Sequence, residues 1–351
     1  MEINQILDLA IERNASDIHL VTGYFPAIRI DDVLYQLSTL PVLTKESSKT
    51  LLTSFLNEEQ KENLFSNKEL DLGYEYKEHR FRVNIYFTRG DLSASFRLIP
   101  MKLRSLGELE LPSQFNNIVD YSSGLVLVTG PTGDGKSTTL AALINLVNSK
   151  YSKHIITIED PIEYVFPKGK SMISQRELHQ DTHSWNLALR SVLREDPDVI
   201  LVGEIRDFDS AQLVLTIAET GILVFSTLHT VSAPETVSRL IDMFPSDQQN
   251  QIKTKLSSVL RAVITQRLIP RNDVRGRIAC VELLFNTPAV ASIIREGKPF
   301  LLDNVLQTSE AEGFIYFEKY LSNLVHQGKV SSQTAEIFTI RPKELKKYLS
   351  I

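Results

Sequence analysis

The sequence has very little cysteine, since Cys280 is the only one among 351 residues. A single thiol cannot form a disulfide within the chain, and it cannot complete a zinc site of the CxxC type. This composition is typical of a protein that works in a reducing compartment. We therefore expect a cytoplasmic location.

Long hydrophobic runs are missing as well. No apolar stretch reaches the roughly 20 residues that a membrane-spanning helix needs. The first residues, MEINQILDLAIERNASD, are acidic and amphipathic, unlike a signal peptide with its basic start and apolar core. We expect no direct insertion into a membrane, so that any membrane association would pass through a protein partner.

The chain also lacks an excess of positive charge. Its formal net charge is −5, which argues against a general nucleic-acid-binding protein. The rest of the composition, with 42% hydrophobic and 23% charged residues, is that of an ordinary globular protein. The length allows two or three domains, each with its own core.

One stretch, residues 124–139, carries the most specific signal in the sequence. It begins with GLVLVT, which is typical of a strand buried on both faces of a parallel sheet. The pattern G-x-x-x-x-G-K-[ST] follows and leads into helix-forming residues, which is the order that a phosphate-binding loop requires. We interpret the stretch as a nucleoside triphosphate site; a glycine-rich turn with a solvated lysine is the alternative. The predicted binding residues are Gly130, Pro131, Thr132, Gly133, Asp134, Gly135, Lys136, Ser137 and Thr138.

Each part of this loop has a chemical reason. Glycines let successive backbone N–H groups turn inward around phosphates, and the next helix points its positive end at them. Lys136 would place a charge on the β- and γ-phosphates, and the hydroxyl of Ser137 would ligate Mg²⁺.

The pattern of strands and helices predicts a two-part α/β protein. The first hundred residues mix strands and helices without βαβ regularity, which favours a compact α+β domain. Later in the chain, apolar runs alternate with helical stretches, which predicts a mostly parallel, doubly wound sheet. The expected domains are an N-terminal domain at 1–100, a linker at 101–114, a P-loop core at 115–287 and a mainly helical region at 288–351.

Polar residues follow the apolar runs. They would lie at the carboxyl ends of the strands, where ligands bind in such sheets. Glu204 follows VILVG and could hold Mg²⁺; a strand-terminal glutamate in a surface turn is the alternative. Glu159, Asp160 and Glu163 cluster in TIEDPIEY, and any of them could be the water-activating base; turn chemistry around Pro161 is the alternative. His229 ends another run, where a hydrogen-bonded structural histidine is the alternative to a functional one.

Four arginines are weaker candidates. Arg190 and Arg194 are four residues apart and therefore share one helix face, which could face phosphates, a neighbouring subunit or solvent. Arg82 and Arg97 lie in predicted strands of the first domain, where their sequence context alone indicates surface charges.

Together, and in this order, the motifs resemble those of the secretion-type hexameric ATPases, most of all the type IV pilus retraction ATPases. The resemblance covers nearly the whole chain through SDIHL, RFRVNIYFTRG, FRLIP, GPTGDGKSTT, TIEDPIEY, ILVGEIRD, TGILVFSTLHT and RAVITQRLIP. It implies a PAS-like N-terminal domain, a RecA-like P-loop domain and a homo-hexamer that hydrolyses ATP with Mg²⁺ to power pilus retraction and twitching motility. It also implies a place at the inner face of the cytoplasmic membrane, an inner-membrane platform protein and a second pilus ATPase as partners, and no nucleic acid.

Carried over position by position, the resemblance gives roles to individual residues. It implies that Glu163 is the catalytic glutamate, Glu204 the Walker B acid and His229 the residue that senses the γ-phosphate. It also gives four arginines a role near the nucleotide or a subunit boundary: Arg82, Arg97, Arg190 and Arg194.

Three features depart from the family pattern. Asp134 replaces a small loop residue, Ile222 replaces a histidine, and residues 290–293 lack the arginine of an AIRNL-like stretch. We expect the Asp134 side chain to turn out of the loop. The third departure keeps open an accessory or diverged motor, besides a nucleotide-binding regulatory subunit with weak turnover and a nucleic-acid translocase, which the acidic balance disfavours.

Overall fold

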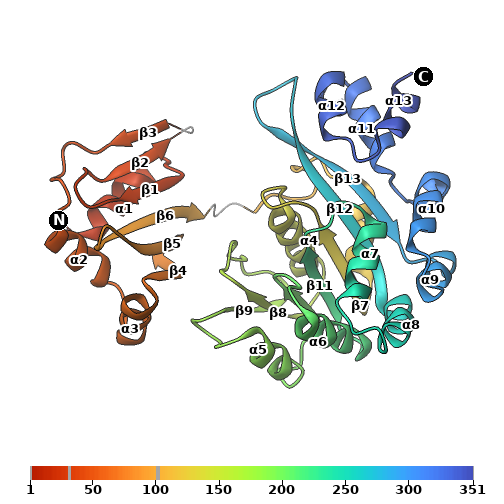
Figure 1. Cartoon of the computed structure of the whole chain (residues 1–351), viewed down its shortest axis with the longest axis horizontal. Coiled ribbons are helices and arrows are strands. Elements are labelled where there is room, and N and C mark those ends of the chain that lie inside the picture. Colours follow the sequence, from red (N-terminus) through yellow and green to blue (C-terminus); the bar gives the residue numbers. More distant parts are fainter. Residues whose placement is uncertain (1, 31–32, 100–102, 351) are drawn as a thin grey trace. The chain divides into compact units, whose positions relative to one another are not determined.

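The structure, a computed structural model, describes residues 2–30, 33–99 and 103–350 (Figure 1). The chain forms two compact units, Met1–Lys102 with Pro161–Val165 and Leu103–Asp160 with Phe166–Ile351. Asp31-Asp32, where the sequence predicts a turn between two strands, and the linker residues 101–102 lie outside the described residues. Within the described ranges, none of the helices combines the length and apolar character that crossing a bilayer demands.

The first unit is an antiparallel six-stranded sheet with the order β3-β2-β1-β6-β5-β4. Its elements are α1 (Ile3–Glu12), β1 (Asp17–Leu20), β2 (Ala27–Ile30), β3 (Val33–Gln36), α2 (Lys45–Thr53), α3 (Glu58–Asn67), β4 (Glu69–Tyr76), β5 (His79–Thr88) and β6 (Asp91–Ile99).

Side chains alternate between the two faces of this sheet. Phe81, Val83 and Phe96 belong to the buried cluster that also takes in apolar residues of α1, α2 and α3. The alternating segments RFRVNIYFTRG and DLSASFRLIP predict a hairpin that turns at Arg89-Gly90-Asp91. The structure confirms it, since β5 pairs with β6 and Arg89 and Gly90 both have positive φ, as a two-residue turn requires. One face of the sheet is therefore core, and the other carries the polar residues.

Two local features of the first unit differ from the prediction. The polar sequence at about 44–65 predicts a single helical stretch, but the structure has two helices there, because Asn57 ends the connection and caps α3 by accepting from the N–H of Gln60. The strand β4 was not predicted, since ELDLGYEY is too polar to stand out from its surroundings.

The second unit contains a seven-stranded sheet with the order β13-β12-β7-β11-β10-β8-β9. All neighbouring strands are parallel except β12 and β13, so the prediction of a mostly parallel sheet is confirmed. Its elements are η1 (Ser113–Asp120), β7 (Gly124–Thr129), α4 (Lys136–Lys150), β8 (His154–Glu159), β9 (Met172–Glu177), α5 (Trp185–Val192), β10 (Val199–Val202), α6 (Phe208–Glu219), β11 (Leu223–Leu228), α7 (Ala233–Asp242), α8 (Gln249–Val259), β12 (Leu260–Pro270) and β13 (Arg277–Phe285).

Helices cover both faces of this sheet, as Figure 1 shows. Leu125 and Leu127 of β7 pack into the cluster that includes α5, α6, α7 and α8. Their neighbours Val126 and Val128 pack into the opposite cluster, with η1 and α4. The strand is buried on both sides, which explains its unbroken apolar sequence.

The chain after the sheet is mainly helical, as expected. It forms α9 (Pro288–Arg295), η2 (Pro299–Leu301), α10 (Leu302–Thr308), η3 (Glu310–Glu312), α11 (Phe317–His326), α12 (Ser332–Phe338) and α13 (Pro342–Leu349). Phe317, Leu321 and Leu345 pack with Ile278 and the buried Cys280 of β13. The last helices are therefore anchored on the β12–β13 hairpin.

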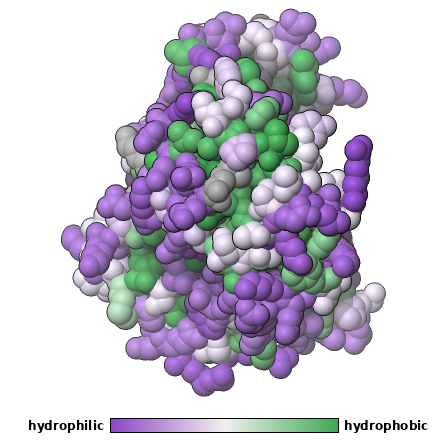
Figure 2. All heavy atoms as spheres, turned by 90° about the vertical axis from the view of Figure 1, so that its left-hand side faces the viewer, coloured by the Kyte–Doolittle hydropathy of each residue, from purple (hydrophilic) through white to green (hydrophobic). Residues whose placement is uncertain are grey.

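Exposed hydrophobic side chains mark one edge of the first unit. Val33, Leu34 and Tyr35 of the edge strand β3 are each about half exposed. Figure 2 shows one face of the molecule, where hydrophilic residues predominate and hydrophobic residues gather in a central group. The core cluster of the first unit takes in residues of α1, α2 and α3, and β3 contributes none of its four side chains to it.

Candidate active site

The glycine-rich loop joins β7 to α4 at the carboxyl edge of the parallel sheet. Gly130 has a φ of 145° and Gly135, the N-cap of α4, has a φ of 77°, values that L side chains rarely adopt. A Cβ added to Gly130 would lie 2.2 Å from the carbonyl oxygen of Gln266 on β12. The loop passes so close to β12 that glycine is required, and the first N–H groups of α4 have no intrahelical partner.

Lys136 is the first residue of α4, and its ammonium lies against the backbone of the loop. Its side chain is buried, and its ammonium donates to the carbonyl oxygens of Gly130 and Pro131 at 2.7 and 2.9 Å. Nδ1 of His229 lies 3.5 Å from the same ammonium. A buried charge needs such partners, so the loop and the end of β11 together hold a cation where phosphates would bind.

A row of polar and charged side chains continues from this lysine across the strand ends. Nε2 of His229, after β11, lies 3.0 Å from Oε2 of Glu204, after β10. Arg206 hydrogen bonds through Nε to Glu204, and its Nη2 lies 3.3 Å from Oδ2 of Asp160, after β8. Because these strands are adjacent and parallel, the polar residues at their carboxyl ends meet, as the sequence predicted.

Glu204 is ionised in this row. Burial raises the pKa of its carboxyl group, but hydrogen bonds from His229 and Arg206 outweigh this effect, so that the pKa lies below its ordinary value. The carboxylate of Glu204 thus lies between the histidine ring and the guanidinium of Arg206.

Gln266 of β12 braces the phosphate-binding loop. Its amide group is buried, accepts from the hydroxyl of Thr139 at 2.7 Å and donates to the carbonyl oxygen of Asp134 at 2.7 Å. Oδ1 of Asp134 accepts from the N–H of Leu268, 3.2 Å away. The Asp134 carboxylate therefore points to β12 and away from the phosphate-binding side of the loop.

Sequence reasoning missed both Gln266 and Arg206. A glutamine within the apolar run AVITQRLI was a detectable signal, because a buried polar side chain in a strand needs a fixed partner. Arg206 stands two residues after Glu204 in GEIRD, and its proximity to a predicted acid could have drawn attention to it.

The three acids of TIEDPIEY are separated by the fold. Asp160 joins the row through Arg206. Glu159 instead accepts from the hydroxyl of Thr157 at 2.6 Å and from the amide of Gln175 at 3.3 Å, within the sheet. Glu163 is exposed, and its segment, Pro161–Val165, is grouped with the first unit.

Arg82 and Arg97 also belong to the first unit. They are direct cross-strand neighbours on β5 and β6, so both lie on the polar face of that sheet. Nε of Arg97 lies 2.9 Å from Oδ1 of Asp17 on β1. Burial raises the pKa of Asp17, but hydrogen bonds from Arg97 and Ser16 bring it below its ordinary value. The two arginines thus form a basic pair, in which Arg97 is held in place by Asp17.

Arg190 and Arg194 do not join the row within the second unit. Both are exposed, and α5 leads to the amino end of β10, where Leu193 and Ile222 line one cavity. β11, with six residues, separates Ile222 from His229, a distance of about 20 Å in a strand. The departure at Ile222 therefore lies at the edge opposite the loop.

The donor set at the row suits Mg²⁺. Mg²⁺ prefers oxygen ligands and is usually held by one or two protein groups together with substrate phosphates and water. Ser137, in the first turn of α4, offers a hydroxyl, and Glu204 offers an ionised carboxylate at the same edge of the sheet. These two residues would hold the ion, and the loop N–H groups and Lys136 would face the phosphates.

Comparison with known proteins places this site in context. A family model described as "Type II/IV secretion system protein" matches residues 1–310. A "Twitching motility protein" of Neisseria gonorrhoeae is 47% identical over 311 residues, which cover 88% of this chain and 83% of that protein. The "Type IV pilus retractation ATPase PilT" of Pseudomonas aeruginosa is 41% identical over 336 residues, covering 95% and 97%. A crystal structure of the pilus retraction motor PilT with bound ADP has a TM-score of 0.92, at 41% identity and 99% coverage of both chains. The similarity extends over both units.

Proposed function

This chain belongs to the type II/IV secretion system protein family, and we propose that it is an ATP-hydrolysing hexameric motor that powers type IV pilus retraction. The observation that carries the proposal is the unbroken row of contacts from Lys136 through His229 to Glu204 beside the phosphate-binding loop. Relatives named for twitching motility and pilus retraction support the proposal that the filament is a type IV pilus and that the motor retracts it.

In this proposal the triphosphate lies against the loop N–H groups and the start of α4. Lys136 exchanges the carbonyl oxygens of Gly130 and Pro131 for phosphate oxygens, at a small additional desolvation cost because its ammonium is already buried. Ser137 and Glu204 hold Mg²⁺, which when bound neutralises charge on the phosphates.

Glu163 is the proposed catalytic glutamate, which orients the attacking water. Asp160 is the alternative base, although its ion pair with Arg206 keeps its carboxylate engaged. His229 is suited to sense the γ-phosphate, since one ring contacts both Lys136 and Glu204.

For the assembly we propose a PAS-like first domain, a RecA-like ATPase domain and a ring of six copies. The proposed domains are 1–100, the linker 101–114, the core 115–287 and the helical region 288–351. Leu106 and Leu111 are buried in the second unit, so the later part of this linker would move with the core. ATP turnover would move the two domains against each other about the linker.

The arginines have proposed roles in such a ring. Arg82 and Arg97 would reach a nucleotide near a domain or subunit boundary, which their position side by side on a polar sheet face permits. Arg190 and Arg194 would act towards a neighbouring subunit, because within their own chain they lie away from the phosphate-binding loop.

The motor would work at the inner face of the cytoplasmic membrane. We propose an inner-membrane pilus platform protein as its partner, without direct membrane insertion and without nucleic acid. A second candidate function is an accessory motor that works beside another pilus ATPase. It is favoured by one observation: residues 290–293 of α9 lack the arginine of retraction ATPases, and Val290 is instead buried in the core.

Two experiments test the proposed function. Glu163→Gln should abolish ATP turnover by the assembled protein while ATP binding survives; an assembled wild type without turnover would leave the regulatory-subunit hypothesis standing. Deletion of the gene should leave surface pili accumulated and twitching lost. Loss of pili would indicate assembly instead, and twitching that requires this protein only when a second ATPase is present would favour the accessory motor.

A further inference from the structure

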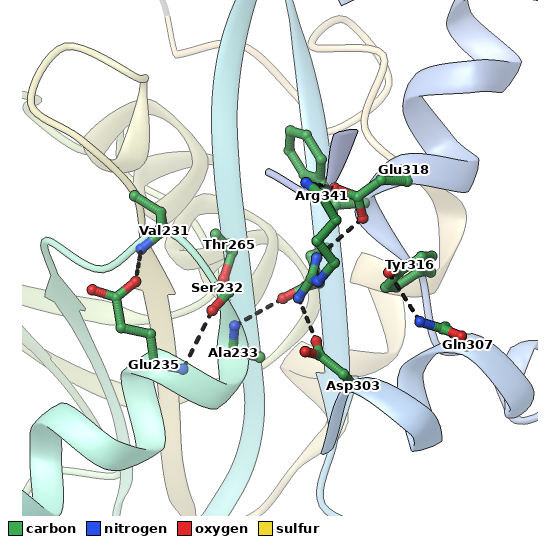
Figure 3. A network of polar contacts seen from close by, with 12 residues as sticks. Val231, Ser232, Ala233, Glu235, Thr265, Asp303, Gln307, Tyr316, Glu318 and Arg341 are labelled. Carbon is green, nitrogen blue, oxygen red and sulfur yellow. Dashed lines mark hydrogen bonds and ion pairs between the residues drawn. The ribbon is translucent and has the colours of Figure 1, made fainter. Parts of the chain in front are cut away.

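A buried polar network joins the C-terminal helices to the sheet of the second unit (Figure 3). Its centre is Arg341, the residue before α13. Nη1 of Arg341 lies 3.0 Å from Glu282 of β13 and 3.1 Å from Glu318 of α11, and its Nη2 contacts Asp303 of α10. The guanidinium also lies over the ring of Tyr316. One arginine therefore joins four elements of the chain.

Glu282 extends this network to α7. Its side chain is fully buried, and Oε1 accepts from the N–H of Ala233 at 2.8 Å, while Oε2 faces Arg341. Ala233 is the first residue of α7, and the first N–H groups of a helix have no intrahelical partner. A carboxylate at this end is favoured by the helix dipole as well. Glu282, on β13, thus fixes the first residue of α7.

The start of α7 is also the end of the loop 229–232, which carries His229. Ser232 caps α7, and the N–H of Val231 donates to Glu235 at 3.0 Å (Figure 3). The last two residues of the loop are therefore attached to the first turn of the helix. At its other end the loop is held by the contacts of His229 with Lys136 and Glu204. Movement of the first turn of α7 would therefore displace the histidine.

A second path of contacts connects the same elements to the phosphate-binding loop. Thr230 and Thr236 share a hydrogen bond of 2.7 Å, and Thr236 reaches Thr129, the last residue of β7, at 3.5 Å. Thr129 is 3.0 Å from Thr265 of β12, which directly opposes Glu282 across the β12–β13 ladder. The buried hydroxyl groups thus run without a gap from the loop strand to the β12–β13 hairpin.

From this geometry we propose that Glu282 and Arg341 form a positioning link, through which docking of the C-terminal helices sets the position of the 229–232 loop and hence the rate of ATP turnover. The inference rests on the proposed ATPase function. Neither residue touches the nucleotide in this account; both act through His229.

The charge balance explains why the link depends on docking. Glu282 and Glu318 are both fully buried, and Arg341 is the cation that lies against both. At pH 8, where Glu282 is ionised, withdrawal of Arg341 would leave two buried carboxylates facing each other, which is strongly unfavourable. The carboxylate of Glu282 would then shift or take up a proton, and its hold on the N–H of Ala233 would change.

The test compares four variants of the full-length assembled protein, namely two single variants of the link, their double variant and a control. Arg341→Gln removes the central charge, and Glu282→Gln removes the buried charge with nearly unchanged shape, so it tests the link even where Arg341→Gln fails to fold. Lys347→Gln is the matched control, because it removes an exposed cation of α13 that pairs only with Glu344 on the same helix among the described contacts. The measurements are kcat and KM for ATP and amide hydrogen exchange of residues 229–242.

Both link variants should lower kcat by about tenfold with KM changed by less than about twofold, and the double variant should lose no more than the worse single one. Exchange in residues 229–242 should accelerate in both, and Lys347→Gln should match the wild type. Faster exchange confined to α10–α13, with wild-type kcat, would overturn the inference and leave the proposed function intact. Absence of turnover in the wild type would instead refute the proposed function.

Discussion

His229 and Glu204 are joined by a 3.0 Å contact between Nε2 of the ring and Oε2 of the carboxylate. The contact spans the ends of the neighbouring strands β11 and β10. It places an ionised acid, suited to a metal ion, against a ring that also faces the buried lysine of the loop. Much of the chemistry proposed for this protein depends on this pair.

Replacing Glu204 with Gln should reduce ATP turnover by about 100-fold or more, in the range found when one charge-stabilising group is removed. The amide keeps the shape but loses the charge that pairs with Arg206, and it loses one of the carboxylate oxygens, of which Oε2 faces His229. Steady-state ATPase assays measure the change, with Glu296→Gln, an exposed acid, as the control. Equal ATPase rates for the two variants would show that Glu204 has no part in ATP turnover.

Gly130→Ala should damage the protein more than Gly133→Ala. Both glycines have positive φ, but only at Gly130 would the new Cβ meet a backbone atom, the carbonyl oxygen of Gln266, whereas at Gly133 the space is open. Thermal unfolding and ATP binding of the two variants separate steric overlap from backbone strain. If both variants show the same loss of Tm and of ATP affinity, backbone strain alone explains the loss, and the close approach of Gly130 to β12 has no effect.

Gln266→Leu should weaken ATP binding about tenfold, a change of about 1.4 kcal/mol. Leucine leaves the hydroxyl of Thr139 and the carbonyl of Asp134 without their partner, so the loop is less well held. Equilibrium binding of a fluorescent ATP analogue is the measurement. Gln333→Leu, at an exposed position of α12, is the control. A variant that binds as tightly as the wild type would show that the loop needs no brace.

Glu282 should make stability depend on pH. Burial raises the pKa of this carboxyl group to about 7, against the opposing effect of Arg341, and Glu318 adds to the rise. Between its unfolded value near 4.5 and about 7, the folded protein holds a proton that the unfolded chain has released. The free energy of unfolding should therefore fall as pH rises through this window. Above about pH 7 the contribution of Glu282 to this free energy should no longer depend on pH.

The measurement for Glu282 is the difference in Tm between the wild type and Glu282→Gln at pH 5 and pH 8. The wild type should lose roughly 5 °C or more relative to the variant across this range, which corresponds to about 2 to 3 kcal/mol. Parallel Tm curves would mean that Glu282 stays ionised throughout, held by Arg341.

The sequence predicted the parts of the fold that follow local patterns. Runs such as GLVLVT are apolar because both faces of the strand are buried, and parallel strands bring their carboxyl ends together. This was enough to predict that Lys136, Glu204 and His229 meet. Helical spacing placed Arg190 and Arg194 on one face, but spacing does not reveal which edge of the sheet that face approaches.

What the sequence could not provide depends on contacts between distant residues. Glu282 and Arg341 are 59 positions apart and meet only because α13 returns to the β12–β13 hairpin. Gln266 and Thr139 are separated by 127 positions. β12 and β13 are apolar runs that could have been predicted as strands, but their places in the sheet are set by tertiary pairing that no short pattern records.

The central claim is that Lys136, held within the glycine-rich loop, binds the phosphates of ATP for hydrolysis. It is tested most directly by measuring ATP binding and turnover, with Mg²⁺, for the wild type and Lys136→Ala. The account predicts that the wild type retains and hydrolyses ATP and that Lys136→Ala loses both turnover and most of its affinity. A wild type that does not bind ATP, or a Lys136→Ala variant with undiminished turnover, would contradict it.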